Sequence, residues 1–509
     1  MQNRHGTSEE SMENQPRTVT SRFLALMTSV ANAAAKARGV RAVERARKCL
    51  AEATVAKVEL NAFTELRDEK SVMADVEAAQ ARWERGEARS PVDGLLFAVK
   101  DNICQAQTRS SAASRMLSNF VAPYDATCVS RLQAAGAIPM GRTNQDEFGM
   151  GSFGLNSYYG PSYRPGDHRV AGGSSSGSAI AVATEACHFA LGSDTGGSVR
   201  LPAAFCGVMG FKPSYGRISR HGLISYASSL DTIGLLSGDV GIIAEAFGVC
   251  AGPDSNDSTC ITSPLESCPL PNETQSDAAA IPLRVGIPVE YNVAELSEDA
   301  RAAWHAQVEH VKICLGPETS IVPMSVPSVR DALPAYYVLA CAEASSNLAR
   351  YDGVQYGHRA AWSDDFETLH QEYTASRTEG FGAEVQRRIL MGAHVLSAEA
   401  FDTLYLRANA VRDALREDFS AVFHHVDFLI TPVAPGPAPT PEEAAQQDLV
   451  QSYLTDVMTV PSSLAGLPSM ALPFARTSTS QEDVGSYQLI AGPRQDAKLL
   501  STARLLSAA

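Results

Sequence analysis

The chain has 509 residues, of which 45% are hydrophobic and 19% charged, and its formal net charge is −15. This size and composition are typical of a folded globular protein and exclude a fibrous or disordered chain. No apolar run approaches the about 20 residues that a membrane helix needs, so we expect no membrane span. The acidic balance argues against a protein that grips nucleic acid alone. In a nucleic-acid complex, a partner would hold most of the backbone.

The N-terminal region and the cysteines bear on the compartment. Residues 1–20 are polar, and we predict that they are disordered. Three arginines among Ser and Thr residues in the first 22 positions suggest a transit segment, whereas Glu9, Glu10 and Glu13 argue against one. None of the ten cysteines forms a C-x-x-C pair, so reduced, mostly buried thiols are predicted. An intracellular or organellar compartment follows.

The first half of the chain predicts helices and then an α/β pattern. From about 25 to 90, the Ala, Glu, Lys and Arg content favours helices at the edge of a domain. The runs Gly94–Val99 and Ala137–Met140 predict strands. Between them, Asp125 is expected to N-cap a helix that stops at Gly136. This alternation favours a parallel or mixed sheet covered by helices.

Later elements continue the alternation. Residues 252–282 are rich in Ser, Pro, Asp and Asn, which predicts a surface excursion. Helical spacing predicts one helix with Trp304, Val308, Val311 and Leu315, ended by Gly316, and another with Leu404, Ala408, Val411, Leu415 and Val422 on one face. Apolar runs predict strands at Val426–Ile430, Ser469–Leu472 and Tyr487–Ile490. Without an internal repeat or a linker, residues 21–509 are expected to form one large domain.

The most unusual stretch is Val170–Arg200, in which two Gly/Ser clusters flank one apolar, Ala-rich run of helical length. Glycine lets several backbone N–H groups converge on one point. Serine at such a turn, before a helix start, lies where an oxyanion could be held. A pair of flexible loops is the alternative, but two clusters around a predicted buried helix favour a catalytic site.

Two generic motif matches carry little weight. The run Gly149–Gly154 (GMGSFG) fits the dinucleotide-binding pattern G-x-G-x-x-G, but polar residues precede it where a strand is required. The run Gly173–Gly177 (GSSSG) fits the nucleophile-elbow pattern G-x-S-x-G, and it too lacks a preceding hydrophobic strand. Neither interpretation is adopted.

Longer motifs carry a specific resemblance. The run GGSSSGSA followed by GSDTGGSVRLPAAFCGVMGFKPSYGRIS is similar to the signature of the amidase family, and FAVKDN at Phe97–Asn102 resembles its lysine motif. Five further stretches resemble the A subunits of the glutamyl-tRNA(Gln) amidotransferases within that family: residues 141–152, 223–234, 336–357, 379–392 and 455–473. The likeness is dense from about 90 to 235 and patchy from 335 to 495. It implies a single amidase-signature α/β domain, whose mixed, twisted sheet is covered by helices on both faces.

The resemblance implies a catalytic relay of three residues. Ser198 would be the nucleophile, Ser174 the bridging serine and Lys100 the base. A free lysine, with a pKa of about 10.4, is protonated at neutral pH, whereas burial disfavours its charged form and would let Lys100 accept a proton. The resemblance also implies a cis peptide bond between Gly173 and Ser174.

The resemblance also implies the residues around the relay. Backbone N–H groups would form an oxyanion hole from Thr195, Gly196, Gly197 and Ser198. Ser175 is expected to be a hydrogen-bonding neighbour. The chain departs from the family's pattern at Ser176, where Gly is usual, and at Ala171, where Pro is common. Both differences leave the relay intact but could shift the loop.

For a glutamine substrate, the resemblance implies that Arg388 holds the carboxylate, that Asp456 holds the ammonium and that Tyr336 lines the pocket. Arginine suits a carboxylate because its planar fork can bind both oxygens. The adjacent Arg387 is an alternative, and an ion pair is the structural alternative for Arg388. Asp456 could instead cap a helix after Thr455.

The implied function is that of a glutamine-hydrolysing subunit. Its ammonia would pass to the B subunit of the amidotransferase, which uses ATP and Mg to amidate glutamate on tRNA(Gln) and holds the misacylated tRNA, and a small third subunit would stabilise the complex. This chain is expected to bind no cofactor and no metal. A mitochondrial location is predicted, with the cytoplasm as the alternative. A stand-alone amidase for small amides uses the same relay but has no need for both Arg388 and Asp456, whereas an inactive scaffold disagrees with the intact relay.

Overall fold

The computed structural model describes residues 35–263, 283–362, 366, 368–474 and 485–507. The disordered extension predicted for residues 1–20 therefore lies outside the described residues. Most of the surface excursion predicted for residues 252–282 lies outside them as well. No helix in the described part of the chain is both long and apolar enough to cross a membrane.

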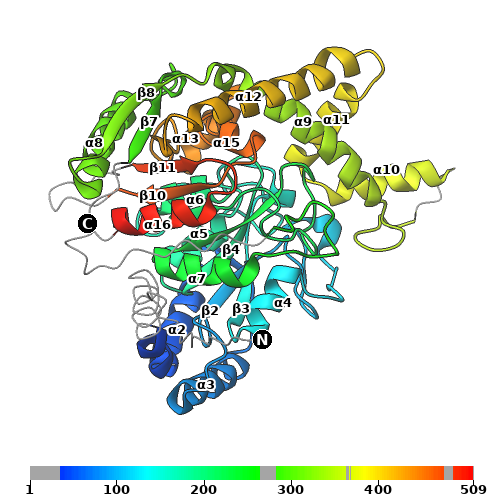
Figure 1. The fold of residues 1–509 in the computed structure, drawn as a ribbon. Helices are drawn as coiled ribbons and strands as arrows, with labels where there is room; N and C mark the ends of the chain where they lie inside the picture. Colours follow the sequence, from blue (N-terminus) through cyan, green and yellow to red (C-terminus); the bar gives the residue numbers. More distant parts are fainter. Residues whose placement is uncertain (1–34, 264–282, 363–365, 367, 475–484, 508–509) are drawn as a thin grey trace, which may run out of the picture.

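One mixed sheet organises the described residues (Figure 1). Its 11 strands are ordered β1-β3-β2-β4-β6-β5-β10-β11-β9-β7-β8. The strands are β1 Phe63–Leu66, β2 Leu96–Lys100, β3 Ile138–Thr143, β4 Phe189–Asp194, β5 Met209–Lys212, β6 Thr232–Ser237, β7 Arg284–Pro288, β8 Ser320–Met324, β9 Phe428–Pro432, β10 Ser469–Pro473 and β11 Ser486–Ala491. Strand β2 pairs in parallel with β3 and β4, whereas β4 pairs antiparallel with β6.

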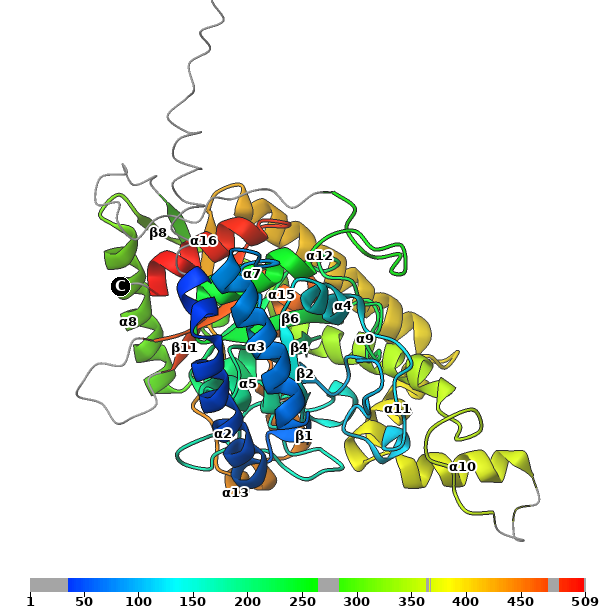
Figure 2. The same ribbon diagram turned by 90° about the horizontal axis from the view of Figure 1, so that it is seen from below.

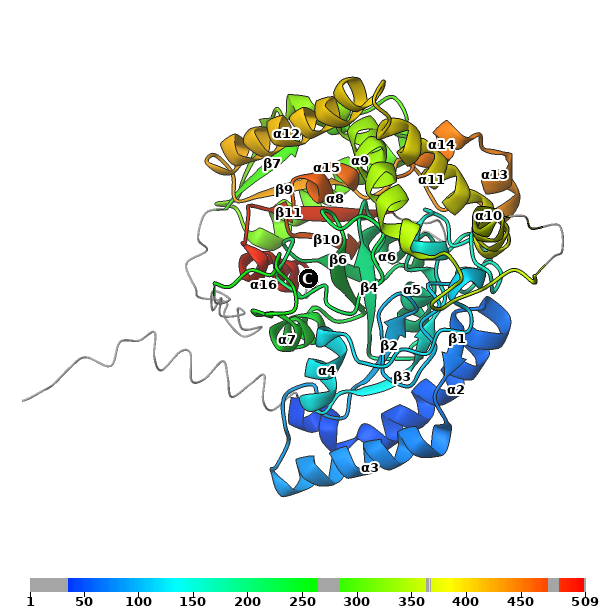
Figure 3. The same ribbon diagram turned by 90° about the vertical axis from the view of Figure 1, so that its right-hand side faces the viewer.

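Helices cover the sheet on both faces. They are α2 Ala42–Leu60, α3 Glu69–Arg85, α4 Thr127–Ala134, α5 Ser176–Ala183, α6 Arg200–Cys206, α7 Val240–Cys250, α8 Glu298–Leu315, α9 Ala332–Asn347, α10 Leu369–Gly380, α11 Ala383–Val395, α12 Arg407–Phe423, α13 Pro441–Gln446, α14 Leu449–Leu454, α15 Val460–Leu464 and α16 Asp496–Ser507. Helices α2, α3, α5 and α6 share one hydrophobic cluster with the sheet, and α4, α7, α8 and α16 share another. Helices α2 and α3 lie side by side, as Figures 2 and 3 show. The single α/β architecture with a mixed sheet is thus confirmed.

The alternation of side chains along β2 positions the base. Leu96 and Ala98 face the cluster with α2 and α5, whereas Phe97 and Val99 face the opposite cluster. Because successive strand side chains point to opposite faces, Lys100 shares the face of Leu96 and Ala98. The end of β2 therefore directs Lys100 toward the start of α5.

Most elements predicted for the second half of the chain are confirmed. Helix α8 ends at Leu315, with Gly316 as its C-cap. Helix α12 covers the second predicted helix except for Leu404, which lies in a π-helix at Phe401–Leu406. The three predicted late strands correspond to β9, β10 and β11. All nine described cysteines are free thiols, and most are buried.

Two predictions are wrong in detail. Asp125 does not cap α4: the N-cap residue is Ala126, and Asp125 Oδ1 instead accepts a hydrogen bond from the backbone N–H of Ala106 at 2.8 Å. The Ala-rich run between the Gly/Ser clusters is not one helix, because α5 ends at Ala183 and the run continues as strand β4. No prediction was made for strands β1, β5, β6, β7 and β8, of which β1 pairs antiparallel with β3.

Candidate active site

Lys100 is fully buried at the end of β2, and four oxygens surround its amine. Lys100 Nζ lies 2.7 Å from Ser174 Oγ, 2.8 Å from Ser175 Oγ and 2.9 Å from Ser193 Oγ. The fourth oxygen is the Ser193 carbonyl, at 3.3 Å. Asn102 Nδ2 donates to Ser193 Oγ at 2.9 Å and so helps to orient the hydroxyl that contacts Lys100. The expected contact between the base and the bridging serine is therefore present.

Burial lowers the pKa of Lys100 to about 7, because the charged amine loses its hydration. The negative charges of Asp146, Asp194 and Asp231 oppose this shift. A neutral amine has a lone pair that can accept a hydrogen bond from a serine hydroxyl. Lys100 is thus poised to exchange a proton with Ser174 near neutral pH.

The second residue of the relay follows a cis peptide bond, Gly173–Ser174, and lies just before α5. Ser198 is brought next to it by a backbone hydrogen bond of 3.0 Å from Ser175 N to the Ser198 carbonyl. Within the described residues, Ser198 Oγ makes no hydrogen bond, and Ser174 Oγ contacts only Lys100 Nζ. The expected Ser174–Ser198 hydroxyl link is therefore not formed in this structure, although the two residues are adjacent.

The turn between β4 and α6 supplies the candidate oxyanion hole. The backbone N–H groups of residues 195–198 donate to no other part of the chain that the structure describes. A Cβ on Gly196 would lie 2.6 Å from Tyr336 Oη, and one on Gly197 would lie 2.1 Å from Thr459 Oγ1. Only glycine fits at both positions, so the side chains of α9 and the segment before α15 shape this turn.

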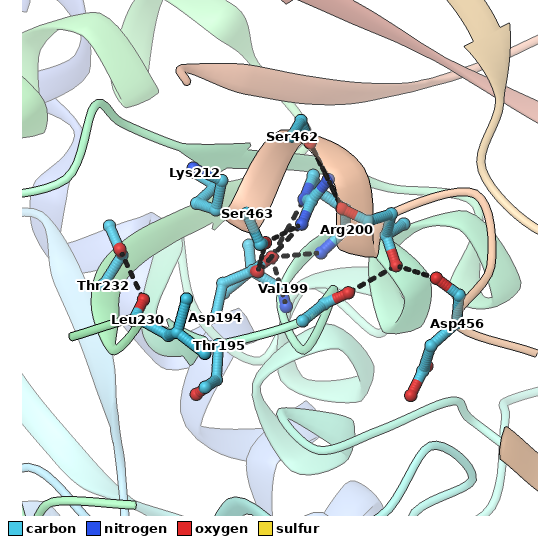
Figure 4. A network of polar contacts seen from close by, with 12 residues as sticks. Asp194, Thr195, Val199, Arg200, Lys212, Leu230, Thr232, Asp456, Ser462 and Ser463 are labelled. Carbon is cyan, nitrogen blue, oxygen red and sulfur yellow. Dashed lines mark hydrogen bonds and ion pairs between the residues drawn. The ribbon is translucent and has the colours of Figure 1, made fainter. Parts of the chain in front are cut away.

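A buried ion pair closes this turn, as Figure 4 shows. Asp194 ends β4 and Arg200 begins α6, and they pair through two contacts of 3.0 Å. Asp194 Oδ2 also accepts from the backbone N–H of Val199 at 3.1 Å. Arg200 donates further to Ser462 Oγ at 2.8 Å and to Ser463 Oγ at 2.7 Å. The sequence analysis did not identify this pair, although both residues lie within the quoted signature.

Arg388 points into the protein from α11, with 3% of its surface exposed. Its Nε donates to Glu384 Oε1 at 2.8 Å, and its Nη1 donates to Tyr226 Oη at 2.7 Å. The rings of Tyr226, Tyr337 and Tyr453 lie 5.2–5.7 Å from its guanidinium carbon. Its Nη2 has no partner within the described residues. The neighbouring Arg387 is partly exposed and pairs with the other oxygen of Glu384.

Asp456 presents one oxygen to the same region. Its Oδ2 accepts hydrogen bonds of 2.9 Å from Ser152 Oγ and from Tyr337 Oη. Its Oδ1 has no hydrogen-bond partner within the described residues. Burial raises the pKa of Asp456 to about 6, so it is largely ionised at neutral pH. It does not cap α15, whose N-cap residue is Thr459.

Tyr337 connects the two substrate-binding candidates, because its hydroxyl reaches Asp456 and its ring lies under Arg388. Tyr336, the tyrosine named from the resemblance, lies against Gly196 and so borders the catalytic turn. Sequence reasoning missed Tyr337, Tyr226 and Ser152, although all three lie in the stretches that carry the resemblance. The site therefore combines a serine, a nearby lysine whose pKa is lowered to about 7, a cation and an anion, which suits acyl transfer from a zwitterionic amide.

Comparison with known proteins agrees with this chemistry. The family model described as Amidase matches residues 44–500. The mitochondrial A subunit of glutamyl-tRNA(Gln) amidotransferase from Coccidioides posadasii is 43% identical over 88% of this chain and 95% of its own. The A subunit of glutamyl-tRNA(Gln) amidotransferase from Aromatoleum aromaticum is 43% identical over 94% of both chains. The crystal structure of the corresponding A subunit from Thermotoga maritima superposes with a TM-score of 0.71 at 31% identity, over 91% of both chains.

The chain belongs to the amidase family, and its relatives include the A subunits of glutamyl-tRNA(Gln) amidotransferases of both mitochondrial and bacterial type. The family likeness extends beyond the catalytic turns, because it covers nearly the whole of the described sheet and its helices.

Proposed function

We propose that this chain hydrolyses glutamine as the A subunit of a tRNA-dependent amidotransferase. The observation that carries the proposal is the pairing of Arg388 with Asp456 through Tyr337 beside the catalytic turn. Free glutamine has a carboxylate and an ammonium, and these two side chains offer one opposite charge to each. An amidase that acts on small neutral amides has no need for both of these charged side chains.

The reaction would begin with the three-residue relay. Ser198 Oγ loses its proton to Ser174 Oγ, whose own proton passes to neutral Lys100, and the oxygen attacks the side-chain amide carbon of glutamine. The backbone N–H groups of residues 195–198 hold the resulting oxyanion. The proton returns through the relay to the leaving nitrogen, so ammonia departs and acyl-Ser198 remains. Water, deprotonated by the same relay, then releases glutamate and restores the hydroxyl of Ser198.

The ammonia is expected to serve a partner. The relatives' names, glutamyl-tRNA(Gln) amidotransferase, support transfer of this nitrogen to glutamate carried on tRNA(Gln). The B subunit would use ATP and Mg for that step and hold the tRNA, and a small third subunit would complete the complex. The mitochondrial relatives, which are fungal, support a mitochondrial location.

The proposal is tested on the native complex purified through a tag on this chain. We expect ammonia release from L-glutamine to exceed release from simple aliphatic amides, and Ser198→Ala to abolish it. We also expect Arg388→Met to raise the KM for glutamine roughly 10- to 150-fold, because hydrogen bonds to a charged group are lost. Arg387→Met, the matched control, removes an outward-facing arginine and should leave KM nearly unchanged.

The second candidate function, a stand-alone amidase, makes the opposite prediction. Efficient turnover of simple amides, with glutamine ignored and Arg388→Met without effect, would contradict the glutaminase assignment. The relay alone favours neither candidate, since both would use Lys100, Ser174 and Ser198.

A further inference from the structure

The motif GMGSFG, which has no role as a dinucleotide site, overlaps a loop that contacts the Gly173–Ser174 peptide, Asp456 and the start of α11. We define the positioning loop as residues 146–152. Its Asp146 N donates to the Ser174 carbonyl at 3.2 Å, and its Ser152 carbonyl accepts from Gly173 N at 2.9 Å. The two ends of the positioning loop therefore hold Gly173 and Ser174, the two residues of the cis peptide bond, by backbone hydrogen bonds.

The same loop reaches the substrate-binding side through three side chains. Ser152 Oγ donates to Asp456 Oδ2 at 2.9 Å, which orients the candidate ammonium ligand. Glu147 Oε2 accepts from the backbone N–H of Gly382 at 2.8 Å. Gly382 is the N-cap residue of α11, the helix that carries Arg388. The ring of Phe148 packs edge-on against Phe381, the residue before Gly382.

Glu147 is well buried, with 5% of its surface exposed. Its Oε1 meets Ser114 Oγ, which also lies 3.2 Å from the Gly380 carbonyl. The single proton of Ser114 Oγ can serve only one of these two acceptors. Glu147 Oε1 is the nearer of the two, so Glu147 accepts hydrogen bonds from both Ser114 Oγ and the backbone N–H of Gly382. Burial raises the pKa of Glu147 to about 7, whereas these two hydrogen bonds lower it.

The path from Glu147 to the substrate ligand is short. Gly382 precedes the first turn of α11, and Glu384 in that turn accepts from Arg388 Nε at 2.8 Å. Tyr453 Oη donates to the same oxygen of Glu384 at 3.0 Å. Any shift of the start of α11 relative to the positioning loop would therefore move Arg388 relative to Ser174 and Ser198.

We propose that Glu147 is a positioning residue that sets the distance between the carboxylate ligand Arg388 and the catalytic serines, by clamping the start of α11 to the positioning loop. The inference rests on the proposed glutamine hydrolysis. Glu147 touches neither relay nor substrate, so its effect falls on binding. Removal of the clamp loosens Arg388 and leaves the relay in place.

The test compares Glu147→Ala and Glu147→Gln in the native complex, with ammonia release from glutamine as the readout. A Gln side chain has the length of Glu147 and keeps an oxygen that can accept from the backbone N–H of Gly382, whereas an Ala side chain loses this contact. We expect Glu147→Ala to raise the KM for glutamine roughly 10- to 100-fold with kcat within a few-fold. We expect Glu147→Gln to keep both parameters close to those of the unchanged chain.

The matched control is Glu379→Ala. Glu379 lies three residues before Gly382 and pairs at the surface with His358 and Arg115, away from the positioning loop. The KM of the Glu379→Ala variant for glutamine should stay unchanged. A fall in kcat with unchanged KM for Glu147→Ala, or a Gln variant as impaired as the Ala variant, would overturn the inference. A wild-type complex that releases no ammonia from glutamine would instead contradict the proposed function itself.

Discussion

At the scale of single residues, the chemistry of this site depends on how Lys100 is buried. Three serine hydroxyls meet its amine, while the carboxylates of Asp146 and Asp231 contribute negative charge to its surroundings. Desolvation is the largest effect and favours the neutral amine, whereas the carboxylates favour the ammonium. The balance leaves the pKa of Lys100 at about 7, near the value at which a base is most useful in neutral solution.

This balance predicts the pH dependence of glutamine hydrolysis. Below pH 7 Lys100 gains a proton and can no longer act as the base, so kcat/KM should fall with decreasing pH through about 7. Below about pH 6 Asp456 also becomes protonated, which should weaken ammonium binding and steepen the fall. The measurement is kcat/KM for ammonia release between pH 5.5 and 9. A profile that stays flat from pH 6 to 8 would contradict the assignment of Lys100 as base.

At the scale of elements, the catalytic turn is fixed at both ends by one buried ion pair. Asp194 ends β4, Arg200 begins α6, and residues 195–198 between them carry the free N–H groups. Arg200 extends the attachment to α15 through Ser462 and Ser463. Strand, turn and two helices are thus held in one arrangement, which would keep a candidate oxyanion hole at residues 195–198 preorganised for substrate.

Loss of one partner of this ion pair should strongly destabilise the folded protein. Arg200→Met leaves the carboxylate of Asp194 buried without its cation, which typically costs about 3–5 kcal/mol. We expect the free energy of unfolding, measured by urea denaturation, to fall by that amount. The surface variant Arg416→Met, which removes an exposed pair with Asp413, should change it by less than about 1 kcal/mol. A loss of under about 1 kcal/mol for Arg200→Met would show that the pair contributes little.

Prediction of elements from sequence succeeded where a pattern is local and failed where tertiary contacts decide. Helix α8 has its own N-cap, Ser297, and its own stop, Gly316, so its bounds could be predicted. The Ala-rich run could not be divided into α5 and β4, because β4 is buried on both faces and shows no alternation. Asp125 was predicted to cap a helix, but its side chain instead accepts a hydrogen bond from the backbone N–H of Ala106, which lies 19 residues earlier in the chain.

The residues of the site also differ in how far the sequence could predict them. Lys100, Ser174 and Ser198 could be named from motifs, whereas the choice between Arg387 and Arg388 required the rotation of α11. The buried positions of that helix are Val385, Arg388, Gly392 and Val395. This spacing was visible in the sequence and would have favoured Arg388. Nothing local distinguishes Tyr337 from Tyr336, because only the packing of α9 against Gly196 separates their roles.

At the scale of the whole molecule, the sheet and its two helical layers support a site assembled from distant segments. The candidate base comes from β2, the candidate nucleophile from the turn before α6, and the candidate substrate ligands from α11 and the segment before α15. Helices α11 and α12 both pack on α9, as Figure 1 shows. The signature alone therefore supplies the acyl chemistry, while the later third of the chain supplies the selectivity.

The charge of the whole molecule yields the last prediction. A net charge of −15 repels a phosphate backbone, so this chain alone should not bind tRNA with a Kd below about 100 µM at physiological salt. The complex with the B subunit should bind tRNA(Gln), and its affinity should fall as salt increases, because the partner's basic residues release counterions. Fluorescence anisotropy with labelled tRNA checks both statements. The Ser198→Ala complex is the matched control and should bind like the unchanged one, since catalysis and tRNA binding would lie on different subunits. Tight, salt-sensitive binding by the isolated chain would contradict this division of labour.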